Sequence, residues 1–220
     1  EFRRVLFRSI PEGDTGAIRT QNILVEWDED FVVRSVRTIT EPDYARNGFA
    51  VHGWEDCRLR LHAGGASVSA TVRDAAGWDG RCRIAVADLD VKKATLSGMR
   101  VLDWDGLQTH EKNWMPYGEE GFLYAANHNG HVVTVDPDAD MPGCYEVRQH
   151  AAAPHIAGGF RGGGQLQPAW GGWLAIVHEV APLDAAPGRA YEHRFVWFDA
   201  DMTLRRMSPL FAFQRRSEEH

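Results

Sequence analysis

The chain has 220 residues, of which 44% are hydrophobic and 25% are charged, and its formal net charge is −7. This composition is typical of a soluble globular protein, and no apolar run approaches the roughly 20 residues that a membrane helix needs. An acidic chain also lacks the clustered basic face that nucleic acids require. We therefore expect a soluble protein with no membrane span and no nucleic-acid partner.

The two ends of the chain are set apart from the fold. Glu1–Ser9 reads "EFRRVLFRS" and Arg216–His220 reads "RSEEH", and both are in-frame translations of sequencing-adapter DNA. We interpret both as adapter-derived artefacts and exclude them from the fold prediction. The remaining Ile10–Arg215 suits about one domain, and we interpret it as an incomplete, metagenomic fragment of a longer reading frame. The expected location is cytoplasmic.

The three cysteines are Cys57, Cys82 and Cys144. They form no CxxC pair and have no zinc-like spacing. Reduced, half-buried thiols are the preferred interpretation, with a Cys57–Cys82 bridge as the alternative.

Along the chain, short apolar segments of period two alternate with turn residues, which is typical of β-strands. The predicted strands are Asn22–Trp27, Phe31–Ile39, Cys57–His62, Ala66–Arg73, Arg81–Leu89, Gly121–Asn127, His131–Asp136, Trp173–Val180, Tyr191–Phe198 and Thr203–Met207. The segments between them supply the Gly, Asn and Asp that tight turns need. No amphipathic helical pattern competes, so the sequence predicts an all-β chain.

One sequence pattern occurs near both ends of this region. Trp27–Ser35 reads "WDEDFVVRS" and Phe198–Arg206 reads "FDADMTLRR", so the same hairpin is predicted twice. Repeated antiparallel hairpins indicate a radial repeat, in which each small sheet is covered by its neighbours in a β-propeller. A β-sandwich is the alternative.

Polar clusters recur at the starts or ends of the predicted strands. They are Glu55, Asp56 and Arg58; His110, Glu111, Lys112 and Asn113; Arg161 and Gln165; His178 and Glu179; and Tyr191, Glu192, His193 and Arg194. The inner strands of a propeller converge on its central channel. One cluster from each blade would therefore form a ring of polar groups around a pocket.

Several motifs carry a resemblance to a known family. "GWEDCR", "HEKNWMPY", "RGGGQL" with "GGWLAIVHE", and "YEHRF" with "FDADMTLRRMSPLFAF" resemble uncharacterised five-bladed β-propeller domains that are found near glycosyltransferases. More distantly they resemble glycoside hydrolase family 130, the mannoside phosphorylases and β-mannosidases. "EDCR" stands where that family has Glu-Asp-Pro-Arg, and "VHE" where it has Tyr-His-Gly. The resemblance implies a five-bladed β-propeller of which about four blades are present.

The resemblance also implies a chemistry. Asp56 corresponds to the general acid of an inverting glycoside hydrolase or phosphorylase, in which water or phosphate attacks across the sugar ring. Lys112 and His178, with Arg58 and Arg161, correspond to ligands of an anion such as inorganic phosphate. Glu55 and Asn113 would contact substrate, and Trp54, Trp114 and Tyr117 would offer ring faces to a sugar. No metal and no cofactor is implied, apart from inorganic phosphate as a co-substrate.

These residues also have structural interpretations, such as an ion pair for Asp56, a core histidine for His178 and a bracing role for His193 and Arg194. Three functions therefore stay open. The first is a carbohydrate-active enzyme acting on an oligosaccharide or glycoconjugate. The second is a non-catalytic glycan-binding module associated with a glycosyltransferase. The third is a propeller that presents loops to a protein partner.

Overall fold

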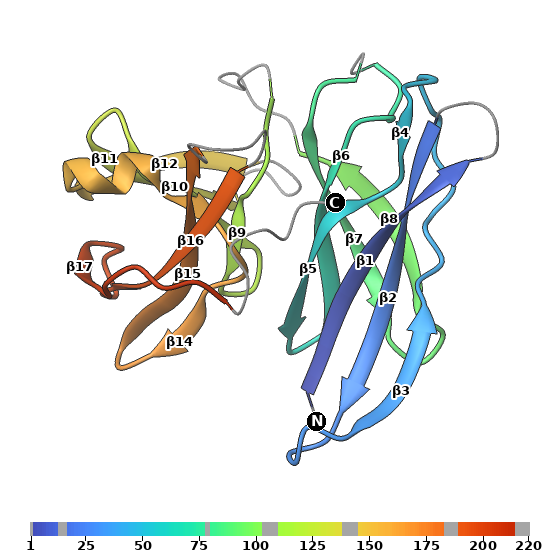
Figure 1. Cartoon of the computed structure of the whole chain (residues 1–220), viewed down its shortest axis with the longest axis horizontal. Coiled ribbons are helices and arrows are strands. Elements are labelled where there is room, and N and C mark those ends of the chain that lie inside the picture. The colour runs from blue at the N-terminus through green and yellow to red at the C-terminus, as the bar shows by residue number, and fades with distance from the viewer. Residues whose placement is uncertain are drawn as a thin grey trace. The chain divides into compact units, whose positions relative to one another are not determined.

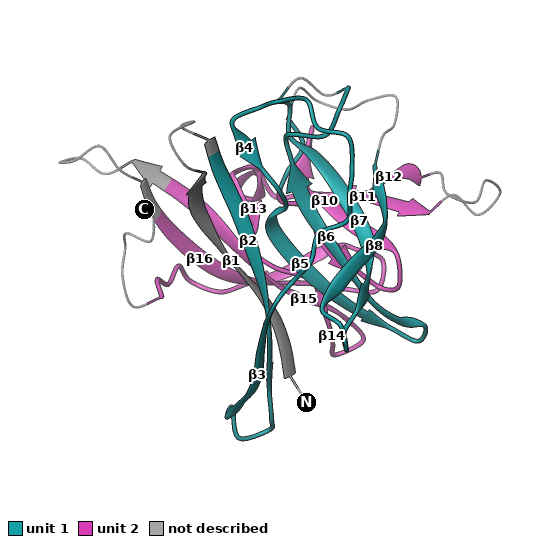
Figure 2. Cartoon of the chain, turned by 90° about the vertical axis from the view of Figure 1, so that its right-hand side faces the viewer, with its two compact units in different colours: residues 1–112 teal, residues 113–220 magenta. Residues whose placement is uncertain are grey.

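The computed structural model describes residues 2–12, 17–77, 80–102, 110–137, 145–182 and 189–213, with side chains from 18 to 180 and from 191 onward within these ranges. The chain divides into two compact units, residues 1–112 and 113–220 (Figure 2). Each unit is described by itself.

The first unit contains two sheets (Figure 1). One consists of β1 (Phe2–Glu12), β2 (Ala17–Trp27) and β3 (Val33–Thr38) in antiparallel order, with the short β4 (Val51–His52) parallel to β2. The other is an antiparallel meander of β5 (Glu55–His62), β6 (Gly65–Val72), β7 (Arg83–Asp90) and β8 (Thr95–Val101).

The second unit also contains two sheets. Its first sheet is the meander of β9 (Met115–Tyr117), β10 (Gly121–His128), β11 (His131–Pro137) and β12 (Tyr145–Ala152). After the 3-10 helix η2 (His155–Gly159), the second sheet is formed by β13 (Arg161–Gly162), β14 (Gln167–Ala169), β15 (Gly172–Pro182), β16 (Arg189–Phe198) and β17 (Leu204–Met207). Both β13 and β14 pair with β15.

The architecture confirms the all-β prediction, since the described residues contain no α-helix. Each sheet is built mainly from strands that follow one another along the chain, as the blades of a propeller are. Strands of a sandwich often pass between its two sheets instead. The four sheets are therefore blade-type sheets. No helix of the described residues is long and apolar enough to cross a membrane.

All the predicted strands coincide with observed ones to within a few residues. Residues 2–12, most of which we had excluded as adapter-derived, form β1 and pair with β2 along its length. A free strand edge accepts many sequences, because the ladder uses backbone groups, so this pairing does not bear on the segment's origin. Residues 214–220 lie outside the described part of the chain.

The repeated hairpin has the same hydrogen bonds in both copies. In the first, the Asp28 side chain accepts the N–H groups of Asp30 and Val32, each at 3.0 Å. In the second, the Asp199 side chain accepts those of Asp201 at 3.1 Å and Thr203 at 2.9 Å. The structure thus confirms the prediction of one hairpin used twice.

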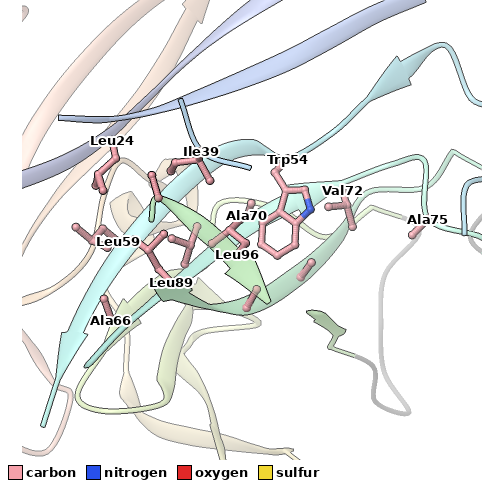
Figure 3. Close-up of a cluster of buried hydrophobic side chains, with 14 residues drawn as sticks. Leu24, Ile39, Trp54, Leu59, Ala66, Ala70, Val72, Ala75, Leu89 and Leu96 are labelled. Atoms are coloured by element: carbon pink, nitrogen blue, oxygen red, sulfur yellow. The ribbon is translucent and has the colours of Figure 1, made fainter. Parts of the chain in front are cut away.

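Each unit has its own apolar core between its two sheets. In the first unit, Leu24 and Ile39 from the β1–β3 side pack with residues of β5–β8. Figure 3 shows the indole of Trp54 among Ala70, Val72 and Leu96. In the second unit, Leu123 and Val132 of one sheet pack with Val177, Val196 and Phe198 of the other.

Candidate functional site

Asp56 lies at a β-bulge near the start of β5. The pairing of β5 with β6 shifts register between Glu55 and Arg58. Asp56 has a φ of 53°, in the left-handed region that non-glycine residues seldom adopt, and its side chain is exposed. Bulges re-aim side chains and are common beside active sites. The backbone at this point therefore presents the carboxylate of Asp56 to solvent.

Glu55 and Arg58 flank Asp56 in different environments. Glu55 is half-buried, and its Oε2 accepts a hydrogen bond from Arg73 Nε at 3.2 Å. Arg58 is only 9% exposed, and burial lowers the pKa of its guanidinium to about 10, while the charge of Asp56 acts in the opposite direction. Arg58 is still positive at neutral pH. Because Arg58 is buried, it is better placed to balance the charge of Asp56 than to bind an anion from solvent.

The segment His110–Lys112 is tied to the same sheet. The Glu111 N–H donates to the Cys82 carbonyl at 2.9 Å, and the Cys82 N–H donates to His110 Nδ1 at 3.2 Å. Cys82 directly precedes β7, next to the end of β6. The first half of "HEKNWMPY" is thereby placed at the end of the sheet where β5 begins.

Lys112 and Glu55 lie around the same point in the first unit. Burial raises the pKa of the Cys82 thiol, whereas the charges of Arg73 and Lys112 lower it and that of Glu55 raises it. Electrostatic effects of this kind decline with distance and are screened by salt. Glu55, Arg73 and Lys112 are therefore neighbours of Cys82. Of the predicted site residues, Glu55 and Lys112 thus both act on the Cys82 thiol, and Asp56 directly follows Glu55 along the chain.

Asn113 and Trp114 belong to the second unit. Asn113 is half-buried with a φ of 65°. Trp114 is 2% exposed and makes edge contacts with Phe122 at 5.8 Å and with Tyr124 at 5.5 Å between ring centroids. Trp114 is thus placed as a core side chain, and it offers no exposed ring face to a sugar.

Arg161 and His178 are direct neighbours in the second unit. They are cross-strand partners on β13 and β15, and His178 is in turn the partner of His193 on β16. Directly opposite residues of an antiparallel pair lie on one face of a sheet. An isolated bridge joins His193 to Phe211. Arg161, His178, His193 and Phe211 therefore form a row across one face of this sheet.

Arg194 has the bracing role that the sequence suggested. Its Nε donates to Glu179 Oε1 at 2.5 Å, and its Nη1 donates to the Ser208 carbonyl at 3.0 Å. These contacts join β16 to β15 and to the segment after β17.

A second aromatic prediction, besides that for Trp114, needs correction. Trp54 is 0% exposed and lies in the core of the first unit (Figure 3), so its predicted contact with a sugar is wrong. Tyr117 is half-buried, its hydroxyl donates to Asp136, and its ring meets Trp173 edge-on at 5.4 Å. Burial raises the pKa of Tyr117, and the bond to Asp136 adds to this. Tyr117 therefore joins the two sheets of its unit.

The sheet of β13–β17 carries a cavity of about 700 Å³. It is lined mainly by apolar and aromatic side chains: Trp170, Leu174, Phe195, Val196, Trp197, Arg206, Met207 and Ser208. None of the predicted site residues lines it.

The first unit also contains a partly buried polar network that the sequence did not predict. It consists of Glu41, Tyr44, Arg46 and Asp74, together with Asn22. Asp74 has 0% exposure, and it accepts hydrogen bonds from Tyr44 at 2.8 Å and from Arg46 at 2.5 Å. The run "EPDYAR" contains Glu41, Tyr44 and Arg46, but nothing in it signals that the Glu41 carboxylate is buried.

Cys57 and Cys82 are free thiols, and Cys144 lies outside the described residues. In the described ranges, no group of three or more His, Cys, Asp or Glu side chains is placed to hold a metal ion. No protein-family model matches the chain, and no match was found among curated proteins.

Proposed function

We propose that the chain binds a carbohydrate at the end of the sheet where β5 begins, and that Asp56 donates a proton to the departing glycosidic oxygen. One observation carries this proposal. Asp56 is exposed on a left-handed backbone at a bulge, directly after Glu55, which Arg73 binds. Strained backbone of this kind gathers at functional sites.

The surrounding charges suit an inverting reaction. A general acid protonates the leaving oxygen while a nucleophile attacks the opposite face of the sugar. When the nucleophile is inorganic phosphate, cationic donors must hold it. Lys112 is exposed and is the group of the first unit that we assign to this role. Arg161 and His178 are cross-strand partners in the second unit, and we assign them to binding of an anionic group within that unit.

The whole molecule on this proposal is a five-bladed β-propeller, of which the four blade-type sheets are part. It would act in the cytoplasm on an oligosaccharide or glycoconjugate, beside a glycosyltransferase.

A non-catalytic glycan-binding module is the second candidate, and one observation favours it. The side chain of Asp56 is exposed, whereas a carboxyl that donates a proton near neutral pH is usually kept protonated by burial or by a neighbouring negative charge. An exposed Asp56 would instead accept hydrogen bonds from sugar hydroxyls.

The test measures glycan binding and sugar release on manno-configured oligosaccharides, with and without phosphate. Asp56→Asn is compared with Lys112→Ala and with Asp30→Asn, which changes an exposed aspartate in the β2–β3 turn. Loss of release with intact binding in Asp56→Asn supports the enzyme, because a general acid contributes mainly in the transition state. Binding that is lost in Asp56→Asn, with no release by the parent, supports the binding module. If neither property responds to Asp56→Asn, both proposals fail.

A further inference from the structure

The residues just before Asp56 are held by buried polar groups. The N–H of Gly53 donates to Asp74 Oδ2 at 3.1 Å, and the N–H of Trp54 donates to Glu41 Oε1 at 3.2 Å. The carbonyl of Trp54 accepts from Asn22 Nδ2 at 2.9 Å. The side chains of Glu41 and Asp74 are 7% and 0% exposed. Two buried carboxylates therefore bind two successive backbone N–H groups.

The two carboxylates are themselves fixed by Arg46. Its Nη1 lies 2.5 Å from Asp74 Oδ2, and its Nη2 lies 3.6 Å from Glu41 Oε2. The guanidinium also lies 4.6 Å from the centroid of the Tyr44 ring, and the Tyr44 hydroxyl donates to Asp74 Oδ1 at 2.8 Å. Hydrogen bonds of such a network strengthen one another in a low dielectric. The acceptors for Gly53 and Trp54 are thus held in place.

Arg73, which directly precedes Asp74 in the chain, binds the side chain of Glu55. Arg73 Nε donates to Glu55 Oε2 at 3.2 Å, while the next residue, Asp74, holds Gly53. The contacts therefore cover Gly53, Trp54 and Glu55 in turn. The side chain that follows, Asp56, is exposed.

We propose that Glu41 and Asp74 are positioning residues, which hold the backbone at Gly53 and Trp54 and so fix the direction in which β5 presents Asp56. The role of Asp56 rests on the proposed function, but the hold on the backbone does not. A functional site requires its side chains to stay in the productive geometry, and surrounding groups that form hydrogen bonds hold them there.

The space around Gly53 fits this assignment. A Cβ atom on Gly53 would lie 2.9 Å from Glu41 Oε1 and 3.2 Å from its Oε2. Gly53 also has a φ of 92°, which side chains rarely adopt. The backbone thus approaches the carboxylate as closely as only a glycine permits.

The protonation of Glu41 gives the hold a pH dependence. Burial raises the pKa of Glu41, and the negative charge of Asp74 raises it further. The hydrogen bond from the Trp54 N–H and the positive charges of Arg46 and Arg19 lower it. Asn22 also faces Glu41, with its Nδ2 3.4 Å from Glu41 Oε1. When the pKa of a carboxyl is higher in the folded state than in the unfolded state, the carboxyl stabilises the fold at low pH. This stabilisation is complete below the unfolded-state pKa and is lost as the pH rises through the folded-state pKa. We expect opening of the turn to expose Glu41 to water. Protection of the Trp54 amide should therefore fall as pH rises through that raised pKa.

The experiment measures hydrogen exchange at the Gly53 and Trp54 amides, corrected for intrinsic rates, in Glu41→Ala, Glu41→Gln and the parent chain. The control is Glu26→Ala, which removes a part-buried carboxylate that binds Ser35 and Arg37 in the same unit. Loss of a hydrogen bond to a charged acceptor should raise exchange at Trp54 about tenfold to a hundredfold in Glu41→Ala. In Glu41→Gln the remaining amide oxygen keeps the protection, and the pH dependence disappears.

Exchange at Trp54 that is no faster in Glu41→Ala than in Glu26→Ala overturns the proposal. If Glu41→Ala does not fold, the parent chain decides, and Gly53 and Trp54 amides that exchange at their intrinsic rates overturn the proposal equally. Asp56→Asn distinguishes a failure of the proposed function from a failure of the positioning role of Glu41. If it leaves glycan binding and release unchanged while Glu41→Ala speeds exchange, the hold on the turn stands and the proposed function fails.

Discussion

The replacement Gly53→Ala tests how closely the turn before Asp56 is built around Glu41. An L-residue at a φ of 92° is strained by roughly 1–2 kcal/mol. The new Cβ would also lie 2.9 Å from Glu41 Oε1 and 3.2 Å from the Thr20 carbonyl, and such overpacking costs roughly 1–3 kcal/mol. The sum is a loss of roughly 2–5 kcal/mol in the free energy of unfolding.

Gly48→Ala is the matched control. Gly48 is in the same unit and has a φ of 77°, but nothing lies within 4 Å of its added Cβ. The free energy of unfolding of Gly48→Ala is therefore lowered by backbone strain alone. Both substitutions also reduce the conformational entropy of the unfolded chain, and this stabilises both variants by a similar amount. The difference in stability between the variants, measured by urea denaturation, should be roughly 1–3 kcal/mol. Gly53→Ala should also cost less in a Glu41→Ala background, because neighbouring changes are not additive. Equal losses for Gly53→Ala and Gly48→Ala would refute this account.

Two further predictions concern other contacts. Gly121→Ala would place a Cβ 2.7 Å from both Asp136 Oδ1 and Tyr117 Cε1; it should break their bond and lower the raised pKa of Tyr117 toward its ordinary value, as followed by spectrophotometric titration. Asp199→Ala should lower the urea midpoint at neutral pH, because Asp199 holds its turn and its pKa is lowered, mainly by the hydrogen bond from Arg205. Stabilisation by a lowered carboxyl pKa is present above the unfolded pKa and lost as pH falls through the folded one, so the difference from the parent should become smaller in acid.

Many of the strands that could be predicted have a buried face, although β3 and β17 were predicted and are mostly exposed. β6 and β7 alternate or run apolar through the core, so their period is visible in the sequence. β12 was missed because it is mostly exposed, and β13 was missed because two residues show no period. Such strands form because they pair with the edge of a neighbouring strand, and this pairing leaves no periodic pattern in the sequence.

The positions of some polar residues follow from the sequence for a related reason. Glu55 and Asp56 stand at the start of β5, and the Glu111 N–H bonds the segment that contains Lys112 to Cys82, directly before β7. Trp54 has the same residue type as a sugar-stacking tryptophan, and only its burial assigns it to the core. Glu41 and Asp74 are separated by more than 30 residues, and they meet only because Arg46 and the turn at Gly53 lie between them.

The buried carboxylates are better explained by geometry than by stability. Removing two charges from water is costly, and apolar residues of similar volume often stabilise a fold as well as an ion cluster does. Apolar side chains, however, cannot accept the N–H groups of Gly53 and Trp54, which Asp74 and Glu41 do. The specific effect of this cluster should therefore be local, on the backbone that leads to Asp56. For this reason the exchange rate of the Trp54 amide is a sharper measure of the role of Glu41 than the melting temperature of the whole chain.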